Sequence, residues 1–160
     1  MTEVADLAVL EEEDTQKDRY LIFALSNELY GIEIRHVTEI IGLQPITVVP
    51  ELPEYICGII NLRGKIIPVM DVRLRFKKQY KEYNDRTCVI VIDINNQAMG
   101  LIVDSVEEVL SIMDSEIVTT AEGTITSNKY IKGIGKVGND VKLLLDCTRL
   151  LNVDEADRMI

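Results

Sequence analysis

Several residue types that carry catalysis are scarce in this sequence. Its 160 residues include no tryptophan, six tyrosines, two phenylalanines and a single histidine, His36. One histidine cannot form a zinc site alone, and His36 stands in no recognisable nucleophile motif. The sequence therefore predicts no cofactor, no metal and no catalytic residues, and an enzyme with an unrecognised site stays a remote alternative.

Long apolar runs are missing as well. No stretch reaches the roughly 18–20 apolar residues of a membrane-spanning helix, and the acidic N-terminus excludes the cationic start of a secretory signal peptide. Cys57, Cys88 and Cys147 are odd in number and isolated within apolar runs, which is typical of reduced core thiols. These absences predict a soluble cytoplasmic protein without direct membrane insertion.

Aliphatic residues are abundant instead. Hydrophobic residues make up 47% of the chain, and most are isoleucine, valine or leucine; the β-branched ones favour strands. The net charge is −10, and residues 1–18 supply −6 of it, with seven acids against one lysine. We expect residues 1–17 to be an acidic, flexible leader before a domain over 18–151. Residues 152–160 are expected to be a tail or a short helix.

The domain contains one pattern twice. YGIEIRHVTEII at 30–41 aligns without a gap with MGLIVDSVEEVL at 99–110, and ICGIINLRGKIIPVMD at 56–71 aligns with IKGIGKVGNDVKLLLD at 131–146. Short strand-like runs with frequent turn signals, duplicated once, predict an all-β fold of two pseudo-symmetric barrels. We expect one lobe over about 18–83 and the other over about 84–151. Asp71 and Asp146, at matching positions, are expected to cap short helical turns.

The two copies differ at one turn. The first copy has NLRGK at 61–65, whereas the second has KVGND at 136–140. Both contain a glycine and polar residues, so both can form a hairpin, and the hairpin does not itself require Arg63. Pro68 cannot donate to a strand ladder, which predicts an edge or a bulge there. Arg63 is therefore either a solvated turn residue or a residue displayed to a partner near a rim, and the spacing leaves both open.

Basic and aromatic residues interleave in RLRFKKQYKEY at 73–83. Such interleaving is typical of proteins that bind single-stranded nucleic acid. The acidic body and the pI near 4.6 oppose a broad phosphate footprint. We expect a solvated link between the lobes and no nucleic-acid partner, with a nucleic-acid-binding barrel as a remote alternative.

Three segments of the sequence resemble the CheW family of chemotaxis coupling proteins. They are YGI–V–EII within 30–41, P–P–Y–GIINLRG–I–PV–D within 50–71, and MGL–VD–V–EV within 99–109. The NLRG turn in this setting is the most specific of these motifs. The resemblance covers about residues 18–151.

This resemblance implies two intertwined, five-stranded SH3-like barrels in a non-catalytic adaptor. The adaptor would join the cytoplasmic tips of methyl-accepting chemotaxis receptors to the regulatory domain of the histidine kinase CheA, within membrane-associated arrays. The receptor-facing positions that it implies are Val37, Glu39, Gly58, Leu62, Arg63 and Gly64. The same domain occurs in CheA and in CheV, so a regulatory domain cut from one of these larger proteins is the runner-up.

Overall fold

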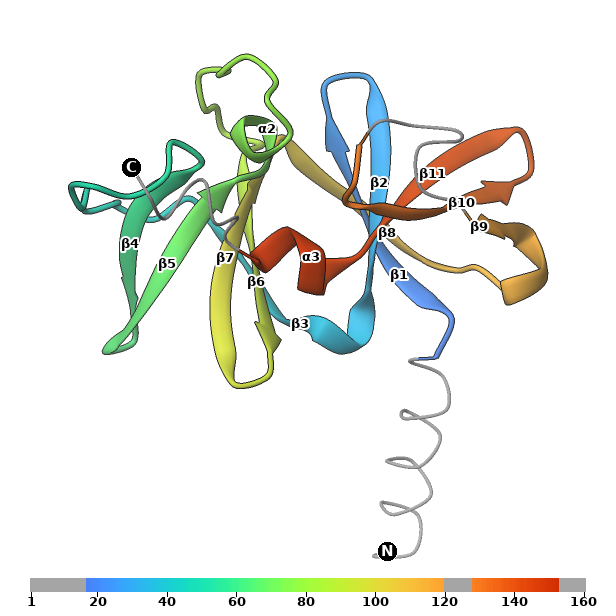
Figure 1. Cartoon of the computed structure of the whole chain (residues 1–160), viewed down its shortest axis with the longest axis horizontal. Helices are drawn as coiled ribbons and strands as arrows, with labels where there is room; N and C mark the ends of the chain where they lie inside the picture. Colours follow the sequence, from blue (N-terminus) through green and yellow to red (C-terminus); the bar gives the residue numbers. More distant parts are fainter. Residues whose placement is uncertain (1–16, 120–127, 153–160) are drawn as a thin grey trace, which may run out of the picture.

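A computed structural model describes residues 17–119 and 128–152 of the chain. The expectations for the leader, apart from Lys17, and for the tail beyond Asn152 fall outside these residues. Figure 1 shows two β lobes side by side with short helices between and around them. None of the helices in the described part of the chain is long and apolar enough to cross a membrane.

One lobe is a six-stranded sheet with the strand order β8-β1-β2-β11-β10-β9. Its strands are β1 (Arg19–Leu25), β2 (Glu28–Glu33), β8 (Ser105–Ser111), β9 (Ile117–Thr119), β10 (Ile131–Val137) and β11 (Asp140–Leu145). The other lobe is a five-stranded sheet with the order β3-β6-β7-β5-β4. Its strands are β3 (Val37–Gly42), β4 (Ile56–Leu62), β5 (Lys65–Asp71), β6 (Cys88–Ile94) and β7 (Gln97–Val103).

The all-β fold with two pseudo-symmetric lobes is confirmed, with one difference in strand number. The six-stranded lobe gains β9, which pairs with β10 at Ile134↔Val118. At the corresponding place in the five-stranded lobe there is only an isolated bridge, Thr47↔Ile59. Pro45 and Pro50 flank this bridge, and proline is a poor strand residue because it cannot donate to the ladder.

The expected lobe boundary near residue 83 is wrong, because the two repeats exchange their first hairpins. The hairpin β1–β2 from the first repeat joins the sheet of the second, and β6–β7 from the second repeat joins the sheet of the first. The joints are two parallel pairs, β2 with β11 at Tyr30↔Leu143 and β5 with β7 at Val69↔Gly100. Because the repeats are alike, their sequences do not reveal which copy supplies each pairing partner.

One hydrophobic cluster spans both lobes as a result, and each lobe has a smaller cluster of its own. The shared cluster joins Phe23 and Tyr30 of the six-stranded lobe with Met70 and Leu101 of the five-stranded lobe. Each fully buried aliphatic side chain of this kind contributes about 1.5–3 kcal/mol relative to exposure. All three cysteines are free; Cys147 is buried in the core, and Cys57 and Cys88 are half-buried. The lobes therefore fold as one unit.

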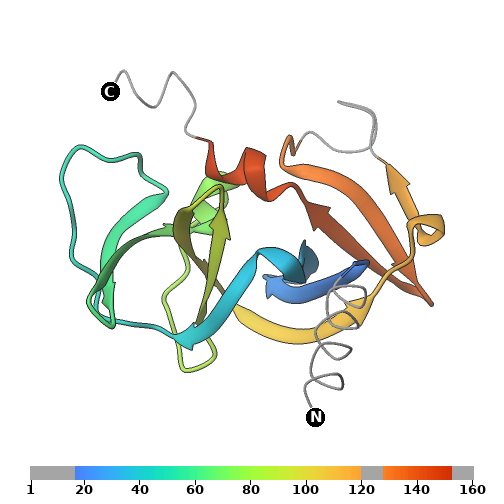
Figure 2. The same ribbon diagram turned by 90° about the horizontal axis from the view of Figure 1, so that it is seen from below.

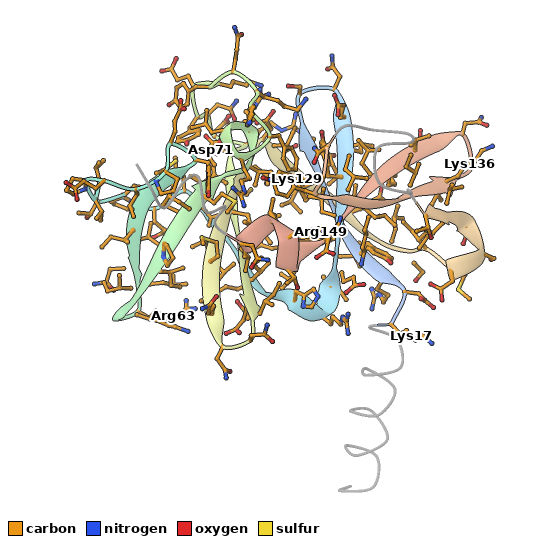
Figure 3. The ribbon with its side chains drawn as sticks, in the orientation of Figure 1. Lys17, Arg63, Asp71, Lys129, Lys136 and Arg149 are labelled. Carbon is orange, nitrogen blue, oxygen red and sulfur yellow. The ribbon has the colours of Figure 1, made fainter. Side chains whose placement is uncertain are left out.

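Two short helices lie between the lobes, α2 (Val72–Arg75) and α3 (Cys147–Leu151); Figure 2 shows α3 at the centre. The capping roles predicted for the two aspartates are confirmed. Asp71 accepts hydrogen bonds from the amides of Arg73 and Leu74, and Asp146 accepts one from the amide of Arg149. Figure 3 labels Asp71 where β5 meets α2. These carboxylates therefore end a strand and start a helix, as N-cap residues do.

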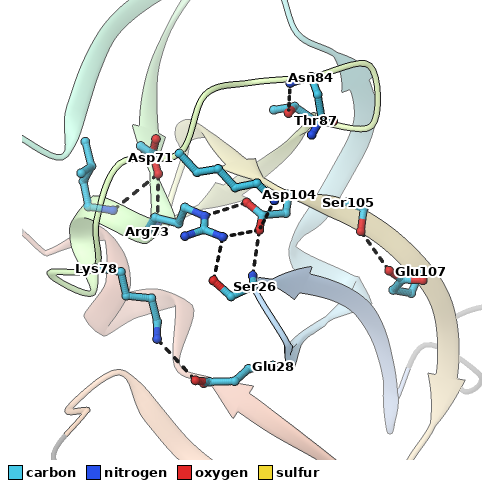
Figure 4. Close-up of polar contacts among 12 residues, drawn as sticks. Ser26, Glu28, Asp71, Arg73, Lys78, Asn84, Thr87, Asp104, Ser105 and Glu107 are labelled. Atoms are coloured by element: carbon cyan, nitrogen blue, oxygen red, sulfur yellow. Dashed lines mark hydrogen bonds and ion pairs between the residues drawn. The ribbon is translucent and has the colours of Figure 1, made fainter.

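The solvated link predicted for 73–83 is correct only for its second part, since Lys77 and residues 79–82 are exposed whereas residues 73–76 are not. Arg73 and Arg75 are buried, and Phe76 stacks on Tyr130 in the core. Arg73 makes a forked ion pair with Asp104, Nε–Oδ1 at 2.8 Å and Nη2–Oδ2 at 2.6 Å (Figure 4). Its Nη2 also donates to the Ser26 hydroxyl. Arg73 and Arg75 thus bind an acid and carbonyls of the chain itself, which leaves only the lysines of this stretch exposed to solvent or in weaker ion pairs.

The chain crosses between the lobes at two places, and each crossing carries a polar cluster. Asp104 lies at the crossing from β7 to β8, where Arg73 binds it. The crossing from β2 to β3 passes through the short helix η1 (Ile34–His36), and Glu33 there binds Arg35 at 2.8 Å and Lys132 at 2.6 Å. Partial burial raises the pKa of Glu33, but the hydrogen bonds from Lys132 and Arg35 outweigh burial and lower this pKa to about 2.

Replacing Glu33 by glutamine should flatten the acid dependence of stability. A folded-state pKa below the ordinary 4.5 contributes stability that is fully present above pH 4.5 and is lost as the pH falls toward 2. The shift corresponds to at most roughly 3 kcal/mol. Urea unfolding between about pH 5 and about pH 3 should therefore show a smaller loss of unfolding free energy in Glu33→Gln than in the wild-type chain. Glu82→Gln, at an exposed position, is the control; equal slopes for the three proteins would contradict the role of Glu33.

Candidate functional site

The NLRG motif forms the hairpin between β4 and β5. Leu62 pairs with Lys65, so Arg63 and Gly64 are the two central residues of the turn. Both have positive φ, 52° at Arg63 and 85° at Gly64, as a type I′ turn requires. The Asn61 side chain accepts a hydrogen bond of 2.9 Å from the Gly64 amide. The backbones of Arg63 and Gly64 form the turn, and the Asn61 side chain stabilises it. The Arg63 side chain is exposed at the tip of the hairpin.

Arg63 occupies a backbone conformation that suits glycine better. The equivalent residue of the second copy is Gly138, with a φ of 62°. For a residue with a β-carbon this left-handed conformation costs roughly 1–2 kcal/mol. The turn geometry therefore does not favour an arginine at position 63. We infer that the arginine is there because of what its side chain contacts.

The Arg63 side chain reaches across the end of the barrel to β3. It makes an ion pair with Glu39, and the two side chains are 70% and 31% exposed. The hairpin and β3 lie at opposite ends of the strand order, so the contact spans the place where the sheet curls toward closure. Figure 3 shows Arg63 at the free tip of the hairpin, away from the lobe junction.

An open pocket of about 330 Å³ lies beside this ion pair. Its apolar lining comes from Leu62, Ile67, Val91 and Ala98, and its polar rim includes Thr38, Glu39, Arg63, Lys65 and Asp93. An apolar floor with a few charged groups at the rim is the usual composition of a binding site. Arg63 can add bonds to carboxylates or backbone carbonyls, because its guanidinium has five donors in a planar fork.

The matching residues of the other lobe form a different surface. Ile67 corresponds to Lys142, which is 2% exposed, and Lys65 corresponds to Asp140. The long Lys142 side chain is buried where the five-stranded lobe has the shorter Ile67. With Gly138 in place of Arg63, this hairpin also has no cation at its tip. The arginine and its pocket lining are therefore particular to the five-stranded lobe.

The structure brings together only some of the positions that the resemblance implies. Glu39, Leu62 and Arg63 line the pocket, and Gly64 shapes the turn. Val37, on β3, packs against the main core cluster and pairs with Ile92. It does not line the pocket.

Gly58 is buried at a bulge at the start of β4, with a φ of 149°. A β-carbon there would lie 2.2 Å from the Thr47 carbonyl oxygen. The close backbone approach that this glycine allows is therefore made by the chain itself. β5 lies between β7 and β4, so it is not the predicted edge strand, but Pro68 lies in the part of β5 that pairs only with β4, before the pairing with β7 begins at Val69.

Several pocket residues carry no motif. Asp93 and Ala98 flank the β6–β7 turn, and Val91 precedes them on β6. The strand alternation of β6 could indicate which side chains point inward, but only the curled sheet places this turn beside the Arg63 hairpin. Among residues 17–119 and 128–152, no three His, Cys, Asp or Glu side chains are placed to hold a metal ion.

Two joined β lobes that carry an arginine hairpin beside an apolar pocket define a scaffold-type β-barrel protein. Comparison with known proteins identifies the family. The CheW-like domain family matches residues 19–155. The chain is 37% identical over 143 residues to the chemotaxis protein CheW of Klebsiella aerogenes, and the match covers 89% of this chain and 86% of that protein. The chain belongs to the CheW family of chemotaxis scaffold proteins.

A solved structure and a longer relative extend this comparison. The crystal structure of the scaffolding protein TtCheW from Thermoanaerobacter tengcongensis matches with a TM-score of 0.79 and 36% identity, covering 86% of this chain and 94% of that one. The chemotaxis protein CheV3 of Helicobacter pylori is 29% identical over 121 residues, which span 39% of its length. The same kind of domain is thus also part of a longer protein.

Alanine substitutions at Gly58 and Gly64 should lower the unfolding free energy by different amounts. Gly58→Ala should lower the unfolding free energy by at least about 2 kcal/mol, because the new methyl group meets the Thr47 carbonyl. Gly64→Ala should cost only about 1 kcal/mol, since its turn position has open space and only the positive φ is unfavourable. Gly42→Ala, with neither constraint, is the control. Urea denaturation measures all three, and a Gly58→Ala protein as stable as Gly64→Ala would contradict the assigned clash.

Proposed function

We propose that this chain is a non-catalytic adaptor that couples methyl-accepting chemotaxis receptors to the histidine kinase CheA. The observation that carries the proposal is the Arg63 tip, an arginine held in a glycine-like conformation beside an apolar pocket. A strained, exposed cation with no need in the turn is more typical of recognition than of stability. Family membership supplies the class of partner.

The receptor-facing surface in this proposal is the pocket and its rim. A receptor tip is a helical hairpin, and a helix offers apolar side chains at a regular spacing and unpaired carbonyls at its C-terminal end. Leu62 and Ile67 would take the apolar side chains, and Arg63 would donate to carbonyls or to a carboxylate. Glu39 holds Arg63 in place before binding. Val37, Gly58 and Gly64 would act indirectly, by holding β3, the base of β4 and the turn.

Exposed aliphatic side chains on both lobes are suited to contacts with the barrels of the kinase. Ile40 and Ile66 are 44% and 56% exposed on the five-stranded lobe, and their equivalents Val109 and Val141 are 38% and 51% exposed on the six-stranded lobe. Side chains of this kind would supply the apolar contacts of such an interface. The chain would then act in the cytoplasm and join receptor arrays through its partners, without entering the membrane or binding nucleic acid.

Arg63→Asn should weaken binding to a receptor signalling tip by about tenfold or more, because a charged hydrogen-bond donor is lost. Asparagine tolerates a positive φ, so the turn should be kept, and the unfolding free energy should change by less than about 0.5 kcal/mol. Titration calorimetry with a soluble receptor tip measures the affinity, and a reconstituted receptor–kinase assay measures activation of CheA.

Lys136→Gln is the matched control, since it removes an exposed cation from the corresponding hairpin of the other lobe. It should bind receptor and activate the kinase like the wild-type chain. Unchanged affinity in Arg63→Asn would show that Arg63 has no part in binding. A wild-type chain that binds neither partner at micromolar concentration would refute the adaptor function itself.

A further inference from the structure

Arg75 is a buried arginine at the centre of the molecule. It ends α2, is only 4% exposed, and lies between two tyrosine rings, 4.1 Å from the centre of Tyr55 and 4.8 Å from that of Tyr130. Its Nε donates a hydrogen bond of 3.1 Å to the carbonyl of Leu150, and its Nη2 donates to the carbonyl of Asn152. One guanidinium therefore contacts both lobes and the C-terminal end of α3.

The duplication shows that this contact lies at the pseudo-symmetry axis. Tyr55 and Tyr130 are equivalent residues of the two repeats, and so are Arg75 and Leu150. Arg75 donates to the carbonyl of Leu150, which is the equivalent residue of the second repeat. The helices α2 and α3 therefore meet at the pseudo-symmetry axis that relates the two repeats. Leu150 is completely buried, so a leucine is acceptable in this environment. Position 150 is thus an apolar one, and this chain has an arginine at the equivalent position of the other copy.

Each tyrosine lies at the base of a hairpin. Tyr55 directly precedes β4, and its carbonyl accepts the Asp71 amide at 2.8 Å; Tyr130 directly precedes β10, and its carbonyl accepts the Asp146 amide at 2.8 Å. The tip of the first hairpin carries Arg63, and the tip of the second carries Gly138. Arg75 therefore joins the bases of the two equivalent hairpins, one in each lobe.

The chemistry of this contact is directional. A guanidinium stacks with its plane over aromatic faces and donates along fixed directions to carbonyls at a helix end. Leucine would fill similar space with contacts that have no preferred direction. An arginine here thus adds a preferred orientation between the lobes to the apolar packing that already holds them together.

We propose that Arg75 is a positioning residue that sets the orientation of the five-stranded lobe, and of its Arg63 hairpin, relative to the six-stranded lobe. The consequence for signalling rests on the proposed adaptor function, because only a partner that contacts both lobes depends on their angle. The orientation itself does not depend on any partner.

Residual dipolar couplings of backbone amides test the orientation in the full chain. In the wild-type protein, the couplings of both sheets should fit one alignment with the lobe arrangement described above. In Arg75→Leu, which copies Leu150, each lobe should still fit its own structure, but the relative orientation should change. Arg75→Lys keeps the charge without the planar fork and should show the same change. Lys77→Gln removes an exposed cation two residues away and should match the wild-type protein.

A wild-type relative orientation in a folded Arg75→Leu would overturn the proposal. If neither Arg75 variant folds, the Nε–H resonance of Arg75 in the wild-type chain decides instead. Two nearby rings and burial predict an upfield shift and slow exchange with solvent; a resonance at the position and exchange rate of exposed arginines would overturn the proposal too.

The functional consequence is measured separately. Arg75→Leu should bind the receptor tip about fivefold or more weakly, a typical size for coupling between distant sites, while the amide shifts of residues 62–65 stay unchanged. If a variant with an altered lobe orientation binds the receptor tip with wild-type affinity, lobe orientation does not affect receptor binding. The positioning role of Arg75 would still stand. A wild-type chain that does not bind receptor would refute the adaptor function, and the orientation result would be unaffected.

Discussion

The exchange of hairpins between the two repeats is the constraint on which the structure depends. Each lobe contains strands from both halves of the sequence, joined through the parallel pairs β2–β11 and β5–β7. Neither lobe can form without the other half of the chain, and the core cluster is shared. The exchange also forces the chain to cross the junction twice, at Glu33–His36 and at Asp104. The ion pairs at these crossings fix the path of the chain where no sheet does so.

Duplication followed by divergence explains where the candidate site lies. Most equivalent positions keep the same role in both copies, as Asp71 and Asp146 do at the helix caps. The exceptions include Arg63 against Gly138, Ile67 against Lys142 and Arg75 against Leu150. The first two differences create an arginine tip beside an open pocket in one lobe only. An adaptor needs two unlike surfaces, and a symmetric scaffold obtains them through substitutions of this kind.

The fold class could be predicted from the sequence because the evidence for it is local. Strand periodicity, glycine turns and the two aspartate caps depend on neighbouring residues, and the repeat alignment fixed equivalent elements within a few positions. The lobe boundary could not be predicted from the repeat pattern, because strands from either copy satisfy the same pairing; only the family resemblance implied intertwined lobes. The burial of Arg73 and Arg75 was missed for a related reason. Composition predicts solvation for cations, and their partners Asp104, Tyr55 and Tyr130 lie far away in the sequence.

The candidate site could be predicted only in part. The part that could be predicted, Arg63, is a residue that does not suit the local backbone conformation. A foldable sequence usually agrees with its structure at every level, and exceptions concentrate where function demands them. Arg63 in a left-handed turn and Arg75 between two tyrosines are both such exceptions. The first is visible once the copies are compared, because the corresponding hairpin of the other lobe has a glycine, Gly138, at the equivalent position. The role of Arg75 can be inferred only from the fold, which places Arg75 against Leu150, its equivalent in the other repeat. Comparing equivalent positions in a duplicated fold thus separates residues that maintain the structure from residues that give its two halves different tasks.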